Sequence, residues 1–130
     1  MDNSTILIVD DDADVLKLLE IELSSEGYQV IKADSGHEAI DKAQKFFPDL
    51  IVMDITMPDL NGGEVIKLLK TKKRMKDIPV IFLTAMLSSS EVKGGTTGLN
   101  IDGTYYPAIA KPFNGPELLA AVKKILAASH

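Results

Sequence analysis

The 130-residue chain has the size of one domain, and with 45% hydrophobic residues it can bury a core without disulfides or structural metal. Its net charge of -5 argues against direct binding to nucleic acid or an anionic membrane, because both would repel it at long range. The absence of cysteine excludes a disulfide framework, a thiolate metal site and a catalytic thiol.

The N-terminal segment MDNSTILIVDDD starts acidic, and its apolar run is too short for a secretory signal. No later run is long enough to cross a membrane. We therefore expect a cytoplasmic protein. Since no second domain, repeat or low-complexity linker is recognisable, residues 1–130 are expected to form one domain.

Short runs rich in isoleucine and valine recur along the chain and predict β-strands. They are Thr5 to Val9, Gln29 to Ala33, Leu50 to Met53, Pro79 to Leu83 and Ala108 to Ala110. Helical patterns lie between them, so strands and helices alternate. Because the strands are apolar on consecutive residues, they indicate an α/β fold with a parallel sheet covered by helices on both faces.

The first helix is predicted over Ala13 to Ser25, and Gly27 ends it. Its core-facing stripe is formed by three leucines at helical spacing: Leu16, Leu19 and Leu23. Outside this stripe the helix carries three more apolar residues: Val15, Leu18 and Ile21. They are expected either to bury the surface of a partner or to pack against the last helix.

Later helices are predicted from their ends. Ser35 with Glu38 forms a capping-box pattern for the second helix, which Pro48 stops. The third helix opens at Gly62, and Asn114 begins the last one.

The segment from Ser88 to Tyr106 resists the alternation, which calls for a fourth helix there. It contains four glycines and few apolar residues. Gly94 and Gly95 alone cost a helix about 2 kcal/mol relative to alanine. We therefore expect an atypical fourth helix that is short, remodelled or mobile.

Polar residues follow the predicted strands at their carboxyl ends. They are Asp10, Asp11 and Asp12 after the first strand, Asp54 after the third, Thr84 after the fourth and Lys111 after the fifth. Because ligands of open α/β sheets bind outside the carboxyl ends of the strands, we expect these groups to form one site.

The acidic residues of this group indicate a metal site. A single aspartate after a strand is commonly only a helix N-cap, and Asp12 has this simple interpretation. Two adjacent carboxylates, Asp10 and Asp11, with a third from Asp54 would repel one another strongly without a counter-ion. The cluster therefore predicts a hard divalent cation with oxygen ligands, and Mg²⁺ fits best.

The other polar residues of the predicted site, Thr84 and Lys111, indicate which chemical group would bind beside the metal. A carboxylate beside Mg²⁺, the Thr84 hydroxyl and the Lys111 ammonium are together complementary to a doubly charged phosphoryl group. Phosphoryl transfer to an aspartate is the simplest chemistry that fits this set.

Four segments carry a resemblance to the response-regulator receiver family. They are ILIVDDD at Ile6 to Asp12, PDLIVMDITMPDLNG at Pro48 to Gly62, PVIFLTA at Pro79 to Ala85 and AKPF at Ala110 to Phe113. The resemblance implies a flavodoxin-like, doubly wound sheet of five parallel strands in the order 2-1-3-4-5. Only Ser88 to Tyr106 falls outside it.

The resemblance also implies a role for each site residue. Asp54 would be the phosphoacceptor and a metal ligand, with Asp11 binding the metal directly and Asp10 through water. The backbone carbonyl of Thr56 would be a further ligand. Thr84 would bond the phosphoryl oxygen, and Lys111 would pair with the phosphoryl group. The Lys111-Pro112 peptide bond would be cis.

The expected function is that of a phosphoacceptor switch and not of an enzyme in the usual sense. A sensor histidine kinase or phosphotransfer protein would donate the phosphoryl group, and an unidentified downstream protein or effector domain would receive the signal. The alternative is a pseudo-receiver, an interaction module of this fold that works without phosphorylation. A flavin-binding domain is disfavoured because the acidic first loop would repel a phosphate. A haloacid-dehalogenase-type phosphatase is disfavoured because the chain is too short.

One position departs from the family. Receivers typically carry a tyrosine or phenylalanine three residues before the lysine, and its ring turns inward on activation. Here that residue is Ala108, and the nearest aromatics are Tyr105 and Tyr106. We expect the aromatic half of the switch to be missing or to be supplied by a displaced tyrosine, with the signal read mainly through ordering of Ser88 to Tyr106.

Overall fold

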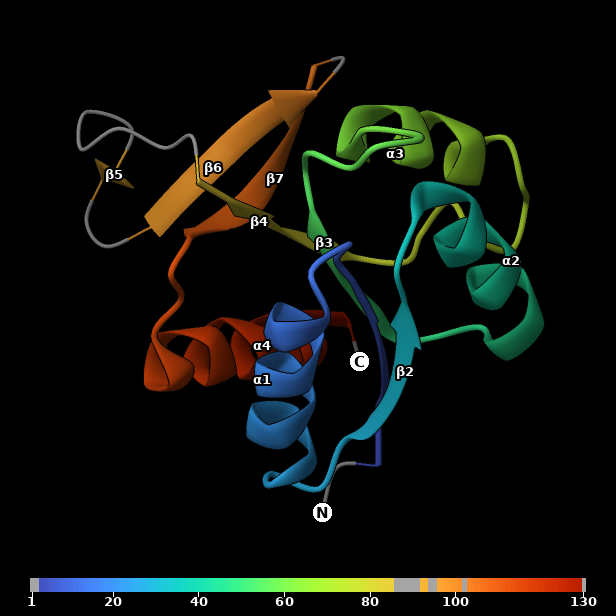
Figure 1. Cartoon of the computed structure of the whole chain (residues 1–130). Coiled ribbons are helices and arrows are strands. Elements are labelled where there is room, and N and C mark those ends of the chain that lie inside the picture. The colour runs from blue at the N-terminus through green and yellow to red at the C-terminus, as the bar shows by residue number, and fades with distance from the viewer. Residues whose placement is uncertain (1–2, 86–91, 94–95, 102, 130) are drawn as a thin grey trace.

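The computed structural model describes residues 3–85, 92–93, 96–101 and 103–129. Five parallel strands form the main part of its sheet: β1 (Thr5–Val9), β2 (Gln29–Ala33), β3 (Leu50–Asp54), β4 (Val80–Thr84) and β7 (Thr104–Ala110). Their order is β2-β1-β3-β4-β7, which confirms the predicted order 2-1-3-4-5 (Figure 1).

Helices cover both faces of this sheet, as predicted. They are α1 (Ala13–Ser24), α2 (Gly36–Phe46), α3 (Gly62–Lys70) and α4 (Gly115–Ser129). Helices α1 and α4 contact each other on one face, and α2 and α3 do so on the other (Figure 1). The predicted caps are present, since Ser35 accepts a hydrogen bond from the N–H of Glu38 and Asn114 accepts one from the N–H of Glu117.

The core consists of two apolar clusters, one on each side of the sheet. On β1, Ile6 and Ile8 point to the side of α1 and α4, whereas Leu7 and Val9 point to the side of α2 and α3. All four side chains are fully buried. This burial on both faces explains why the strand sequences are apolar on consecutive residues.

The segment that was expected to hold an atypical fourth helix forms strands in the part that the structure describes, apart from the turn at Gly103. β5 (Val92–Lys93) and β6 (Thr96–Ile101) extend the sheet antiparallel to β7, so that its full order is β2-β1-β3-β4-β7-β6-β5. Threonine, isoleucine and tyrosine favour extended backbone, whereas the glycines disfavour helix. Residues 86–91, 94–95 and 102 lie outside the described part of the chain.

The turn between β6 and β7 is made by a glycine in the left-handed region. Gly103 has φ +85°, a conformation that glycine adopts without steric cost. Its N–H donates to Oδ1 of Asn100 at 3.0 Å. The hairpin is anchored to the core through Leu99 and Ile101, which pack against the cluster on the side of α2 and α3.

Candidate functional site

The predicted site residues meet at the carboxyl edge of the sheet. Asp10 directly follows β1, Asp54 is the last residue of β3, and Lys111 directly follows β7. Carboxylate oxygens of Asp10, Asp11 and Asp54 all lie within 4.8 Å of one another. Asp10 and Asp54 are buried and Asp11 is exposed, so the cluster opens to solvent on the side of Asp11.

Lys111 supplies the positive charge of this pocket. Its Nζ lies 2.7 Å from Oδ2 of Asp10 and 3.3 Å from Oδ2 of Asp54, so one ammonium bridges two buried carboxylates. The backbone N–H of Lys111 donates to the carbonyl of Thr84 at 2.9 Å. The Lys111-Pro112 peptide bond is cis, as the family resemblance implies.

Burial and charge shift the protonation of this pair. Burial raises the pKa of Asp10 because desolvation penalises the carboxylate, although Lys111 and the N–H of Asp12 oppose this shift. Burial alone would lower the pKa of Lys111. The ion pairs with Asp10 and Asp54 together outweigh burial, so that the pKa of Lys111 is raised and the ammonium stays charged.

Three neighbouring residues complete the edge. The N–H of Asp12 donates to Oδ1 of Asp10 at 2.9 Å, and Asp12 itself caps α1 by accepting from the N–H of Asp14, which matches its simple interpretation. The N–H of Thr56 donates to Oδ1 of Asp54 at 3.1 Å. Thr84 is the last residue of β4 and is buried.

The donor set fits a hard divalent cation. It consists of carboxylate oxygens with no sulfur or imidazole among them, as hard cations prefer. Oδ2 of Asp10 is buried and accepts no well-aligned hydrogen bond within the described residues, although the Lys111 ammonium is close enough for an ion pair. A buried carboxylate oxygen with unused lone pairs is suited to bind a cation or its water shell.

The position three residues before Lys111 is Ala108, which is buried on β7 next to Phe82 of β4. Tyr106 is the buried tyrosine nearest to this position, and it lies on β7 itself. Its ring is buried and meets the ring of Phe82 edge-on, with centroids 5.7 Å apart. Tyr105 is instead exposed, and its ring lies over Gly98 of β6.

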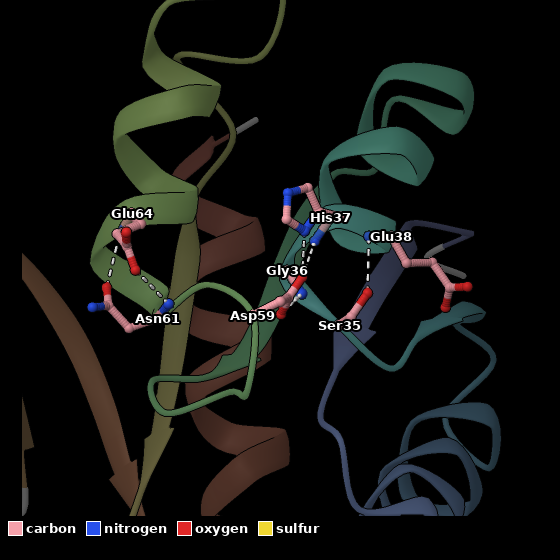
Figure 2. Close-up of polar contacts among 7 residues, drawn as sticks. All are labelled: Ser35, Gly36, His37, Glu38, Asp59, Asn61 and Glu64. Atoms are coloured by element: carbon pink, nitrogen blue, oxygen red, sulfur yellow. Dashed lines mark hydrogen bonds and ion pairs between the residues drawn. The ribbon is translucent and has the colours of Figure 1, made fainter.

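Sequence reasoning missed the contact of Asp59 with His37, which involves the loop that follows Asp54. Asp59 lies in the loop between β3 and α3, and its carboxylate bonds the first residues of α2 (Figure 2). These partners are 22 and 23 positions apart in the chain, so no local pattern indicates the contact.

The fold and the edge cluster define a class of protein, the doubly wound α/β domains with an acidic pocket at the carboxyl ends of the strands. Within that class, residues 6–123 match the model of the response regulator receiver domain. The chain belongs to this family, which serves two-component signalling.

Individual relatives agree with this assignment. The alkaline phosphatase synthesis transcriptional regulatory protein PhoP of Bacillus subtilis is 41% identical over 98% of this chain and 50% of its own length. The polar-differentiation response regulator DivK of Brucella ovis is 35% identical over 94% of this chain and 95% of its own. The chemotaxis protein CheY4 of Vibrio cholerae superposes with a TM-score of 0.81 at 29% identity, over 95% of this chain and 99% of its own.

The chain spans about half the length of PhoP and of several other curated relatives that it matches. None of the described helices is long and apolar enough to cross a lipid bilayer.

Proposed function

We propose that residues 1–130 form one phosphoacceptor switch domain, in which Asp54 receives a phosphoryl group from a sensor histidine kinase or a phosphotransfer protein. The observation that supports this most strongly is the bridging of Asp10 and Asp54 by one ammonium inside a cluster of three carboxylates. This arrangement pairs a nucleophilic oxygen with the charges needed to hold a phosphate beside it.

In the proposed reaction, a carboxylate oxygen of Asp54 forms a bond to phosphorus. The bond from phosphorus to the donor imidazole nitrogen breaks, and its electron pair leaves with that nitrogen. Asp54 is suited to this role because the N–H of Thr56 and the ammonium of Lys111 fix its two oxygens in the pocket. The product is an aspartyl phosphate, which water hydrolyses slowly.

The surrounding residues serve binding and charge. Asp10, Asp11, Asp54 and the backbone carbonyl of Thr56 would hold Mg²⁺, which would neutralise charge on the transferring phosphoryl group. Lys111 would exchange its contact with Asp54 for one with the phosphoryl oxygens, and Thr84 would donate its hydroxyl to the same group. The change in these contacts would alter a surface recognised by a downstream protein or effector domain.

The experiment is phosphorylation by acetyl phosphate with and without Mg²⁺, followed by intact-mass spectrometry. The wild-type protein should gain one phosphoryl group only with Mg²⁺, and Asp54→Asn should gain none, because the amide keeps the volume but loses the nucleophilic charge. Asp12→Asn is the matched control, since Asp12 caps α1 and lies outside the cluster. It should be phosphorylated like the wild type.

Two outcomes would contradict the proposal. Phosphorylation of Asp54→Asn to the wild-type extent would move the acceptor to another residue. A wild-type protein that is not phosphorylated under any of these conditions would indicate the alternative, a pseudo-receiver.

A further inference from the structure

The loop between β3 and α3, residues 55–61, joins the proposed phosphoacceptor to the helices on one face. It begins directly after Asp54 and contains Thr56, whose N–H bonds the Asp54 carboxylate. On one side this loop is fixed to the sheet, because the N–H of Ile55 donates to the carbonyl of Leu83 on β4 at 3.0 Å. The N–H of Gly62, the first residue of α3, donates to the carbonyl of Ile55 at 2.7 Å and so ties the two ends of the loop together. The position of Thr56 beside Asp54 therefore depends on the contacts that fix this loop to the neighbouring elements.

On its other side the loop is fixed to α2 through the carboxylate of Asp59. Oδ1 accepts from the N–H of Gly36 and Oδ2 accepts from the N–H of His37, both at 3.0 Å (Figure 2). Nδ1 of the His37 ring also lies 2.6 Å from Oδ2. The N–H groups of His37 and Gly36 hold the pKa of Asp59 well below its usual range, so the carboxylate is charged at neutral pH.

Helix α2 does not depend on Asp59 for its own N-cap. Ser35 already caps it by accepting from the N–H of Glu38 at 3.1 Å. Asp59 bonds two different N–H groups, those of the first two residues of the helix. The contact therefore connects two elements, whereas the Ser35 contact is internal to one.

The backbone of α2 also approaches this loop closely. A Cβ at Gly36 would lie 2.7 Å from Cβ of Leu60 and 3.1 Å from Cγ2 of Val65, so any larger residue would push the loop or α3 away. Leu60 is partly buried against the core on this side. Glycine at position 36 thus allows the loop to approach α2 closely, and the Asp59 carboxylate holds the loop there.

We propose that Asp59 is a positioning residue for phosphoryl acceptance, acting by fixing the loop that carries Thr56 beside Asp54. Asp59 itself would touch neither the metal nor the phosphoryl group. This proposal rests on the proposed function of Asp54. Releasing the loop should displace the Thr56 backbone, which is expected to bind Mg²⁺ and which bonds the Asp54 carboxylate. Removal of such a supporting contact typically weakens metal binding about tenfold or more.

The test compares Asp59→Ala and Asp59→Asn with Ser35→Ala. The serine variant is the matched control because it removes an N-cap from the same helix without touching the loop. Four quantities are measured: Mg²⁺ affinity by calorimetry with the metal alone, the rate of phosphorylation by acetyl phosphate at saturating Mg²⁺, the melting temperature, and amide exchange at Gly36 and His37.

Asp59→Ala should lose about tenfold in Mg²⁺ affinity and phosphorylate more slowly at saturating Mg²⁺. Asp59→Asn should have a Mg²⁺ affinity and a phosphorylation rate closer to those of the wild type, because its amide oxygen still accepts a hydrogen bond from a backbone N–H. Ser35→Ala should lower the melting temperature while leaving Mg²⁺ affinity and rate at wild-type values. Amide exchange at Gly36 and His37 should accelerate in Asp59→Ala, which would show that the contact has been released in a folded protein.

Wild-type affinity and rate in Asp59→Ala would overturn the positioning role, and so would losses in Ser35→Ala as large as those in Asp59→Ala. If Asp59→Ala does not fold, Asp59→Asn decides in the same way, because it must be weaker than the wild type in Mg²⁺ affinity. Failure of the proposed function looks different, since the wild-type protein itself would then not be phosphorylated.

Discussion

Asp11 is the residue of the acidic cluster that solvent reaches. Asp10 is fully buried and already paired with Lys111, whereas the side chain of Asp11 is exposed. A side chain in this position can contribute charge to a bound cation without a structural role. Substitution of Asp11 should therefore change the affinity for the metal without changing the stability of the metal-free fold.

Asp11→Ala should weaken Mg²⁺ binding while leaving the metal-free stability close to that of the wild type. Each tenfold loss in affinity removes about 1.4 kcal/mol of the stabilisation that saturating Mg²⁺ provides. Thermal melts with and without Mg²⁺ measure this directly. A Mg²⁺-induced rise in melting temperature equal to that of the wild type would assign the metal to other ligands.

Asp59 gives the molecule a pH-dependent contribution to stability with a defined sign. Its pKa is lowered in the folded protein by the N–H groups of His37 and Gly36, relative to about 4 in an unfolded chain. The stabilisation is therefore fully present above about pH 4 and is lost as the pH falls and the folded carboxylate is protonated.

The difference in melting temperature between the wild type and Asp59→Asn should accordingly shrink as the pH is lowered from about 5 to about 2. The difference between the wild type and Ser35→Ala should stay constant over this range, because the Ser35 hydroxyl does not titrate. A constant difference for Asp59→Asn as well would show that the charge of Asp59 does not stabilise the fold.

At the scale of elements, the β6–β7 hairpin stands where the family alternation calls for a fourth helix. It brings Tyr106 against Phe82, two residues before Thr84 on β4. A displacement of Thr84 toward a phosphoryl group would therefore reach the hairpin through Phe82 and the buried Tyr106 ring. Ala108 is too small to fill or vacate a cavity as a ring does.

We predict that phosphorylation is read out mainly through ordering of the segment from Ser88 to Tyr106. Amide exchange in β6 should slow when the phosphoryl mimic beryllofluoride is bound with Mg²⁺. Asp54→Asn, which cannot bind the mimic as an acyl phosphate analogue, should show no such change. Equal exchange of β6 with and without the mimic in the wild-type protein would contradict this readout.

The elements that the sequence predicted well are those with local causes. The strands Thr5–Val9 and Gln29–Ala33 have the expected bounds, and the caps Ser35 and Asn114 lie where their hydroxyl and amide side chains indicate. Their signals are apolar runs and residues within one helical turn of each other. The edge cluster could also be foreseen, because parallel strands bring their carboxyl ends together.

The hairpin and the contact of Asp59 were not foreseen, for different physical reasons. The Asp-Gly pair at residues 102–103 lies between extended-favouring residues and is a recognised hairpin signal, which the expected alternation of strands and helices does not take into account. The Asp59 carboxylate meets an N–H more than twenty residues earlier, as the 22-residue separation from His37 shows. Such a contact exists only after the sheet has formed.

At the scale of the whole molecule, α1 presents an apolar surface next to the site. Leu16, Leu19 and Leu23 are buried as predicted, and Val15 packs partly against the core. Leu18 and Ile21 are 56% and 55% exposed, so these two residues are free to meet a partner. Leu18 also lines an open groove with Lys111, Pro112 and Phe113, which connects this surface to the site.

Leu18→Asp should therefore slow phosphoryl transfer from a sensor histidine kinase that phosphorylates the wild-type protein, while transfer from acetyl phosphate stays unchanged. Its melting temperature should change little because the residue is exposed. Leu68→Asp is the matched control, since Leu68 is an exposed leucine of α3, on the opposite face of the sheet. Equal transfer to both variants at the wild-type rate would refute docking at α1.

Asp54 carries the phosphoryl group in the proposed reaction, and chemical mapping of the modified residue tests this most directly. Borohydride reduces an aspartyl phosphate to homoserine, so the protein phosphorylated by acetyl phosphate with Mg²⁺ can be reduced, digested and sequenced by mass spectrometry. We predict homoserine at position 54, and none in protein treated without Mg²⁺. Homoserine at position 10, 11 or 12 instead, or at no position, would contradict the claim.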